Sequence, residues 1–88
     1  DATAAQYNID PFDPDQALDA AARYMASLHQ RYVDKGHEDV AWSLAAAGYN
    51  WGPGNVDKFL EGTRRAPDET KSYVAQVHEF YGESNPLA

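Results

Sequence analysis

The 88-residue sequence contains no cysteine, which excludes a disulfide framework and a thiolate metal site but indicates no particular redox compartment. Basic residues are scarce: 7 Lys and Arg stand against 14 Asp and Glu, giving a formal net charge of −7. This charge disfavours binding to nucleic acid and to anionic lipid. No apolar run approaches the roughly 18 residues of a membrane span, and the first residues lack the features of a signal peptide.

The residues that are present are typical of one small globular domain. With 43% apolar and 24% charged residues, the chain is too apolar to be read as disordered. No internal repeat and no alternating strand pattern is found, whereas apolar residues recur at helical spacing. We therefore expect a single all-α domain of about four helices with short loops. Residues 1–12 form its initial segment, and residues 83–88 are expected to be a loose tail.

The longest expected helix runs from Pro14 to about Asp34. Asp13 is its predicted N-cap, because it directly precedes a proline at the first helical position. Apolar residues then follow three- and four-residue spacing. Lys35 and Gly36 supply the stop signals, a cation in the last turn and a residue that accepts positive φ.

Three shorter helices are expected after this one. A stripe of small residues predicts a second helix over residues 38–48, which leads into a tight glycine- and proline-rich reversal at residues 52–54. Asn55 is the predicted cap of a short third helix that ends at Gly62. Residues 67–69 open a fourth helix, and Gly82 ends it.

Several acidic residues are candidates for chemistry but have simpler interpretations. Asp10, Asp13 and Asp15 are spaced like calcium ligands, yet the intervening prolines do not fit an EF-hand loop, and helix capping explains them better. Glu69 and Glu79 are the acids with aromatic or apolar neighbours in sequence, so they are the candidates for a general acid. Their positions are more simply explained by the helix dipole and by an exposed helix face.

Metal and nucleophile chemistry have little support. His29, His37 and His78 include no pair at the four-residue spacing of a helical zinc site, and none of the serines lies in a glycine-rich elbow. We expect His29 and His78 to be partly buried helix residues. No metal site and no cofactor is predicted.

The cluster Tyr49, Asn50 and Trp51 is unusual for a connector. Aromatic faces stack on sugar rings, and amides and phenol hydroxyls hydrogen-bond to sugar polar groups, so this cluster suits a saccharide cleft. The alternative is that Tyr49 and Trp51 are core rings on either side of a turn. The residues alone leave both interpretations open.

Three segments together resemble the soluble lytic transglycosylase (SLT) family, whose catalytic domain has a lysozyme-like, goose-type helical fold. Residues 47–54, Ala-Gly-Tyr-Asn-Trp-Gly-Pro-Gly, are similar to the family signature Ala-Tyr-Asn-Ala-Gly-Pro-Gly. Residues 10–16 with residues 22–25 resemble its Asp-Pro-x-Asp-Pro and Ala-x-x-Tyr-Leu segment, and residues 69–74 resemble Glu-Thr-x-x-Tyr-Val. The motifs occur in family order and cover nearly the whole chain.

The sequence also departs from the family pattern. Gly48 stands where the family has alanine, and Trp51 replaces a small residue, while Gly52, Pro53 and Gly54 keep the structural turn. The family's catalytic glutamate lies in an upstream Glu-Ser motif that is followed by Gly-Leu-Met-Gln, and no Glu-Ser pair followed by Gly-Leu-Met-Gln occurs in these 88 residues. The resemblance therefore implies the C-terminal part of a catalytic domain, with no catalytic residue assignable here.

The resemblance implies cleavage of the bond between N-acetylmuramic acid and N-acetylglucosamine in peptidoglycan, with a 1,6-anhydro product. By transfer, Tyr49, Asn50 and Tyr73 line the substrate cleft, and Trp51 is a candidate sugar platform. We expect the chain alone to be inactive, with peptidoglycan strands and a separate N-terminal segment that carries the glutamate as partners. The alternatives are a non-catalytic glycan-binding or protein-interaction module and a homo-oligomer.

The implied location is the bacterial periplasm, the cell envelope or a phage virion.

Overall fold

The computed structural model describes residues 14–88, and every regular element in that range is helical. The initial segment and the predicted cap Asp13 lie outside the described residues. The elements are α2 (Pro14–Asp34), η1 (Glu38–Val40), α3 (Ala41–Trp51), α4 (Pro53–Leu60), α5 (Asp68–Val77) and η2 (His78–Tyr81). The all-α prediction is confirmed. None of these helices is long and apolar enough to cross a membrane.

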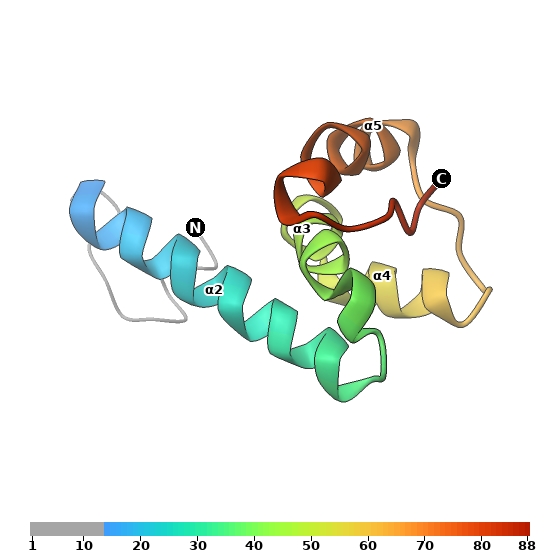
Figure 1. The fold of residues 1–88 in the computed structure, drawn as a ribbon, viewed down its shortest axis with the longest axis horizontal. Helices are drawn as coiled ribbons and strands as arrows, with labels where there is room; N and C mark the ends of the chain where they lie inside the picture. Colours follow the sequence, from blue (N-terminus) through green and yellow to red (C-terminus); the bar gives the residue numbers. More distant parts are fainter. Residues whose placement is uncertain (1–13) are drawn as a thin grey trace.

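Helix α3 is the centre of the fold. It contacts α2 on one side and α4 and α5 on others, so it is enclosed by the rest of the chain (Figure 1). Its small side chains allow the neighbouring helices to approach closely, and a large residue would separate them. Seven of its residues are buried: Ala41, Ser43, Leu44, Ala45, Ala46, Ala47 and Gly48.

The C-terminal half of α2 packs on α3. Leu28 is 3% exposed and Tyr32 is fully buried. Both Leu28 methyl carbons lie 3.5 Å from the place that a Cβ of Gly48 would occupy, so the two helices are in close contact there. The helix ends as predicted, at a Schellman motif in which the His37 and Gly36 N–H groups donate to the Tyr32 and Val33 carbonyls.

A single residue joins α3 to α4. Gly52 has φ 103° and ψ 135°, a conformation that side chains disfavour, and its N–H donates to the Gly48 carbonyl at 2.8 Å. The prediction that Asn55 caps the next helix is wrong. Helix α4 begins at Pro53, because proline lacks an N–H and already has a helical φ. Asn55 instead donates its side-chain amide to the Trp51 carbonyl at 2.7 Å.

The expectation of a loose tail is wrong for two of its residues. Leu87 is 2% exposed and belongs to the hydrophobic core. The Glu83 carboxylate accepts hydrogen bonds from the Trp42 and Ser43 backbone N–H groups, at 3.1 and 2.7 Å, and from the Ser43 hydroxyl at 2.7 Å. Helix α3 has no capping side chain next to it in sequence, so its first donors need an acceptor from elsewhere. The tail supplies that acceptor.

Candidate functional site

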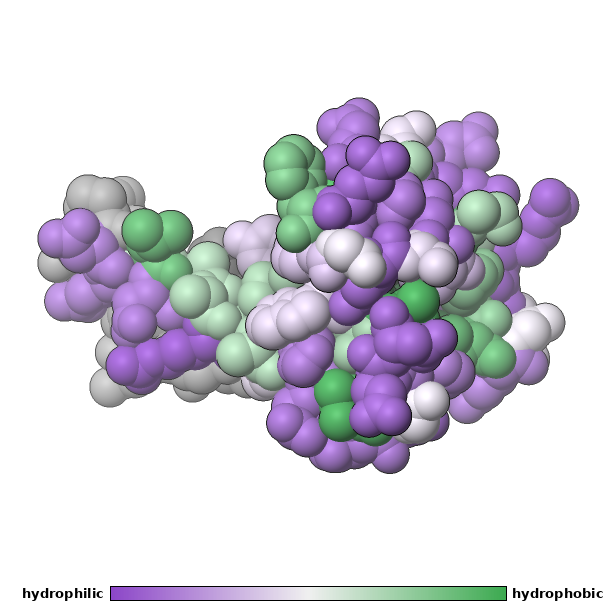
Figure 2. Space-filling view, in the orientation of Figure 1, coloured by the Kyte–Doolittle hydropathy of each residue, from purple (hydrophilic) through white to green (hydrophobic). Residues whose placement is uncertain are grey.

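An open cavity of about 230 Å³ lies between the N-terminal half of α2 and the ends of α3 and α5. Figure 2 shows green and pale green side chains along α2 beside the body of the molecule, where this cavity lies. The lining is apolar on one side and phenolic on the other. Its residues are Leu18, Ala21, Ala22, Met25, Tyr49, Tyr73 and Tyr81. We call it the tyrosine cavity.

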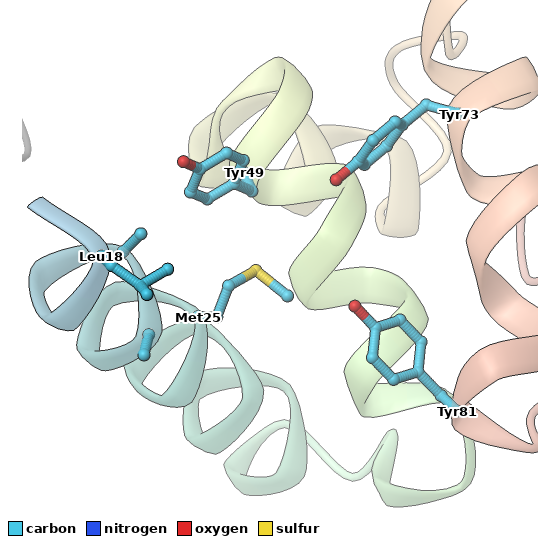
Figure 3. Close-up of a pocket in the computed structure, with 7 residues that line it drawn as sticks. Leu18, Met25, Tyr49, Tyr73 and Tyr81 are labelled. Atoms are coloured by element: carbon cyan, nitrogen blue, oxygen red, sulfur yellow. The ribbon is translucent and has the colours of Figure 1, made fainter. Parts of the chain in front are cut away.

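The floor of the tyrosine cavity is one face of α2. Residues 18, 21, 22 and 25 share this face because they follow three- and four-residue spacing. Leu18 is 72% exposed, which is unusual for a large aliphatic side chain on a helix of the fold. Met25 extends its thioether toward the middle of the cavity (Figure 3). The same helix therefore buries its C-terminal apolar residues and leaves these open.

The walls are three tyrosines from different elements. Tyr49 comes from the last turn of α3, and its ring lies 6.0 Å from the Tyr24 ring. Tyr73 comes from α5 and Tyr81 from η2, and both hydroxyls point into the cavity (Figure 3). None of the three wall hydroxyls hydrogen-bonds to another residue within 14–88. They are therefore open to an incoming polar ligand.

Tyr81 is held in a stack of three rings. Its ring lies 5.9 Å from that of Trp42 at an interplanar angle of 18°, and Trp42 lies 3.9 Å from His29 at 20°. Burial, with smaller contributions from Tyr73 and Glu83, raises the pKa of Tyr81. The phenol is therefore neutral at physiological pH and can donate a hydrogen bond.

The predicted site residues fall into two groups. Tyr49 and Tyr73 line the cavity, although they come from separate sequence motifs. Asn50 and Trp51 do not line it. The side-chain amide oxygen of Asn50 (Oδ1) accepts a hydrogen bond from the buried Thr70 hydroxyl at 2.9 Å, which joins the two motifs. Trp51 is half-buried and packs against the hydrophobic core.

Sequence reasoning missed five lining residues. Helical spacing places Leu18, Ala21, Ala22 and Met25 on one apolar face of the first helix, and Tyr81 recurs at the same kind of spacing in the last helix. Spacing identifies a face but not what covers it. The one available signal was that Tyr81 follows Tyr73 by two helical turns, which places both rings on the same side.

Among residues 14–88, no carboxyl group lines the tyrosine cavity. The candidate acids Glu69 and Glu79 are both exposed and lie outside its lining. His29 and His78 are partly buried, as expected; His78 Nδ1 lies 2.9 Å from the Glu83 carbonyl oxygen. Within residues 14–88, His, Asp and Glu side chains form no group of three that could hold a metal ion.

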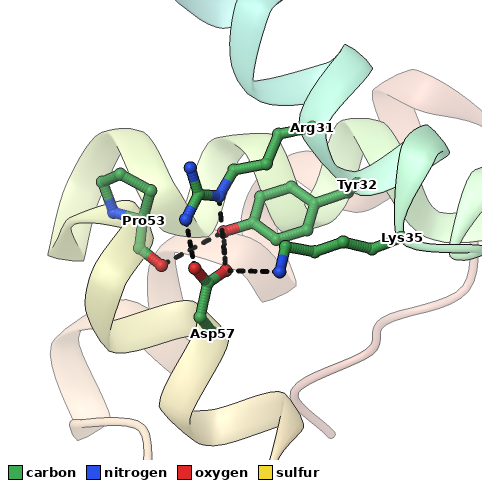
Figure 4. A network of polar contacts seen from close by, with 5 residues as sticks. All are labelled: Arg31, Tyr32, Lys35, Pro53 and Asp57. Atoms are coloured by element: carbon green, nitrogen blue, oxygen red, sulfur yellow. Dashed lines mark hydrogen bonds and ion pairs between the residues drawn. The ribbon is translucent and has the colours of Figure 1, made fainter.

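A second feature, which we call the polar corner, lies where α2 meets α4. It consists of Arg31, Tyr32, Lys35, Pro53 and Asp57 (Figure 4). Asp57 accepts two hydrogen bonds from the Arg31 guanidinium, one of them at 3.4 Å, and lies 3.3 Å from the Tyr32 hydroxyl and 4.0 Å from Lys35 Nζ. Tyr32 also donates to the Pro53 carbonyl at 3.4 Å.

The polar corner connects α2 to α4, and its polar groups already have partners within the chain. The hydrogen bonds from Arg31 lower the pKa of Asp57, so the carboxylate is charged at neutral pH. Burial raises the pKa of the Tyr32 hydroxyl, which is therefore protonated. A neighbouring cavity of about 280 Å³ includes Lys35, His37 and Asp57 in its lining, but Asp57 already has partners within the chain. The tyrosine cavity is the better candidate site.

The family model described as transglycosylase SLT domain matches residues 2–72, which is most of the chain. This match confirms the family expected from the three motifs. No solved structure matches the chain.

Proposed function

Because the chain belongs to the transglycosylase SLT domain family, we propose that it forms the substrate-binding wall of a peptidoglycan lytic transglycosylase. The family acts on the glycan strands of peptidoglycan by cleaving glycosidic bonds. In this proposal the tyrosine cavity holds one sugar of the strand, and Tyr49 and Tyr73 contact it. The location that goes with this function is the bacterial periplasm or envelope, or a phage virion.

The convergence of the two motif tyrosines is the observation that supports this proposal. Tyr49 belongs to the Ala-Gly-Tyr-Asn segment and Tyr73 to the Glu-Thr-x-x-Tyr-Val segment, yet both line one cavity. Asn50 and Thr70, which are their neighbours in the same motifs, hydrogen-bond to each other and fix the two segments. In this proposal the two motif tyrosines face the ligand. The Asn50 amide and the Thr70 hydroxyl hold the segments that carry those tyrosines in position.

The reaction also needs a general acid that protonates the leaving oxygen. None of the described residues that line the cavity carries a carboxyl group, so in this proposal a separate segment carries the glutamate and the chain supplies binding and orientation. The phenols of the wall suit this role because a hydroxyl can both donate a hydrogen bond to a sugar hydroxyl and accept one from it. Glycan binding by the isolated chain is then independent of cleavage.

A non-catalytic glycan-binding module is the second candidate. The same observation favours it, since the described lining of the cavity can contact a sugar but offers no acid to cleave the glycosidic bond. The two candidates predict the same binding and differ in whether a partner segment restores activity.

Incubation with purified sacculi tests the catalytic part of the proposal. We expect the 88-residue chain to release no anhydro-muropeptides. Release would show that the chain contains its own acid, and Glu69→Gln would be the first variant to make. If the parent protein, or the chain mixed with its Glu-Ser segment, releases none either, the non-catalytic candidate is favoured.

Tryptophan fluorescence tests sugar binding and the role of Trp51. The chain has two tryptophans, and Trp42 contacts the cavity through Tyr81. We expect chitooligosaccharides to change the emission of the Trp51→Phe variant, which keeps Trp42. An equal change in Trp42→Phe, which keeps Trp51, would support Trp51 as a sugar platform. Unchanged emission in the wild type and both variants would remove the support for sugar binding.

A homo-oligomer is the remaining possibility for the open apolar floor. A second copy that covered Leu18 would close the tyrosine cavity, so the binding proposal requires a monomer or an interface elsewhere. Sedimentation analysis with and without Leu18→Gln distinguishes these cases. We expect a monomer in both samples, and a dimer that Leu18→Gln dissociates would contradict the proposal for the isolated chain.

A further inference from the structure

Tyr81 lies in the tyrosine cavity but outside the three sequence motifs. It is in η2, seven residues beyond the last motif segment, and its ring is fixed by the stack with Trp42 and His29. Its hydroxyl points toward the cavity from the side opposite Tyr49 (Figure 3). A ring held on one face and a hydroxyl with no partner among the described residues form a preorganised hydrogen-bonding group.

The floor opposite Tyr81 has a different chemistry. Ala21 and Ala22 present methyl groups, and Met25 adds an unbranched thioether that can adapt to a small apolar group. The volume of about 230 Å³ lies below the roughly 300 Å³ at which drug-sized ligand pockets begin. The space therefore suits one sugar unit and its substituent, with an apolar contact and a phenol close to each other.

An N-acetyl group has the matching chemistry, since it combines a methyl group with an amide that can donate and accept hydrogen bonds. We propose that Tyr81 and Met25 select N-acetylated sugars, with the acetamido methyl against Met25 and Ala22 and the Tyr81 hydroxyl bonded to the acetamido group. This inference rests on the proposed glycan-binding function and names the residues that would distinguish N-acetylated sugars from other β-linked hexoses.

The expected effects are modest and measurable. Loss of one buried methyl contact weakens binding about fourfold. Removal of one neutral hydrogen bond weakens it about 2- to 10-fold. A sugar without the acetamido group loses both interactions, so we expect it to bind at least about 10-fold more weakly than the N-acetylated sugar.

Two neutral trisaccharides with the same linkage are the probes. Tri-N-acetylchitotriose carries the acetamido group, and cellotriose has a hydroxyl in its place; neither is charged, so the net charge of −7 does not bias the comparison. Met25 is the one methionine of the chain, so its methyl NMR signal needs no assignment and reports directly on the floor. We expect the N-acetylated trisaccharide to shift this signal and to bind more tightly than cellotriose.

Matched variants separate the two contacts from folding effects. Tyr81→Phe keeps the ring stacked on Trp42 and removes the hydroxyl, and Met25→Gln keeps the length of the side chain and makes it polar. We expect each to weaken the N-acetylated trisaccharide about 2- to 10-fold and to leave cellotriose unchanged. Met25→Leu and Phe80→Leu are the controls, because the first keeps the floor apolar and the second changes an 85% exposed ring outside the lining.

The outcomes distinguish the inference from the function on which it rests. If the wild type prefers the N-acetylated sugar but Tyr81→Phe and Met25→Gln bind it normally, selection lies elsewhere and the inference is wrong, while glycan binding stands. If the wild type binds both trisaccharides equally, the inference is also wrong. If the wild type binds neither, both fail. Urea unfolding of each variant establishes that a weakened binder is folded.

Discussion

The polar corner and the tyrosine cavity both place tyrosines against polar and apolar neighbours. Among residues 14–88, only the tyrosine hydroxyl of the corner finds hydrogen-bond partners. Tyr32 is fully buried and its hydroxyl lies near both Asp57 and the Pro53 carbonyl. Tyr49 is 47% exposed, and the hydroxyls of Tyr73 and Tyr81 point into open space. The difference suits a division of roles, in which the corner stabilises the fold and the cavity is the proposed ligand-binding site.

Removal of Asp57 is expected to have the largest effect on stability. Asp57→Ala takes the acceptor from Arg31 and Tyr32 together, and because Arg31 is partly exposed we expect a loss of about 2–3 kcal/mol. Urea unfolding measures the loss. Glu61→Ala, which removes an exposed charge at the end of the same helix, is the control and should stay within about 0.5 kcal/mol. Equal losses in the two variants would contradict a special role for the corner.

The corner also predicts a dependence of stability on pH. The hydrogen bonds from Arg31 hold the pKa of Asp57 below its ordinary value of 3.8 in the folded state. The carboxylate therefore stabilises the fold above that pH, and its contribution is lost as the pH falls below 3.8. We expect the difference in unfolding free energy between wild type and Asp57→Asn to be constant above about pH 5 and to shrink in more acid solution. A difference that grows on acidification would contradict this assignment.

Gly52 connects the two regions, since it follows the helix that carries Tyr49 and precedes the corner residue Pro53. Its φ of 103° is unfavourable for any side chain, so Gly52→Ala should lower stability by about 1–2 kcal/mol. Gly54→Ala is the matched control, because that glycine lies within α4 with open space around its Cβ position. Thermal unfolding should show that Gly54→Ala is as stable as the wild type or slightly more stable. If both variants are destabilised equally, the positive φ of Gly52 is not the reason for the loss.

Deletion of one hydroxyl from each region tests the division of roles directly. Tyr32→Phe should cost about 0.5–1.5 kcal/mol of stability and leave trisaccharide affinity unchanged. Tyr81→Phe should change stability by less than about 0.5 kcal/mol and weaken binding, because its hydroxyl has no partner among the described residues. Urea unfolding of both variants measures their stability, and calorimetric titration measures their affinity for the trisaccharide. The reverse pattern would mean that the two regions have been assigned the wrong way round.

The smallest expected effect is at Gly48, where the family has alanine. A Cβ there would lie 3.5 Å from the Leu28 methyl carbons, which is ordinary van der Waals contact. Gly48→Ala should therefore stabilise helix α3 by up to about 1 kcal/mol without changing binding. A loss of stability on thermal unfolding would show that the contact between α2 and α3 is tighter than these distances indicate.

The parts of the fold that were predictable depend on local signals. The bounds of α2 follow from periodicity and from end residues within a few positions, and the stop at Gly36 forms as expected. Tyr49 and Tyr73, from two separate motifs, line one cavity, and their contact with a substrate stays a prediction. The helix bounds can be read from residues close together in the sequence, and the two tyrosines can be found from motifs that are characteristic of the family.

The parts that were missed depend on contacts between distant residues. Glu83 caps α3 from 40 positions away, so nothing near Ser43 indicates it. Met25 and Tyr81 have the spacing of core residues, and only the arrangement of helices in space shows that they face a cavity. Asn55 was misjudged for a local reason, because Pro53 starts the helix earlier than a polar cap would.

Mapping the bound sugar by NMR tests the central claim most directly. Aromatic-ring and methionine-methyl spectra of the wild-type chain would be recorded during a titration with tri-N-acetylchitotriose. We predict saturable shifts at Tyr49, Tyr73, Tyr81 and Met25, and none at Tyr32 in the polar corner. Shifts centred on the corner, or no shift at any of these residues, would contradict the assignment of the tyrosine cavity as the glycan-binding site.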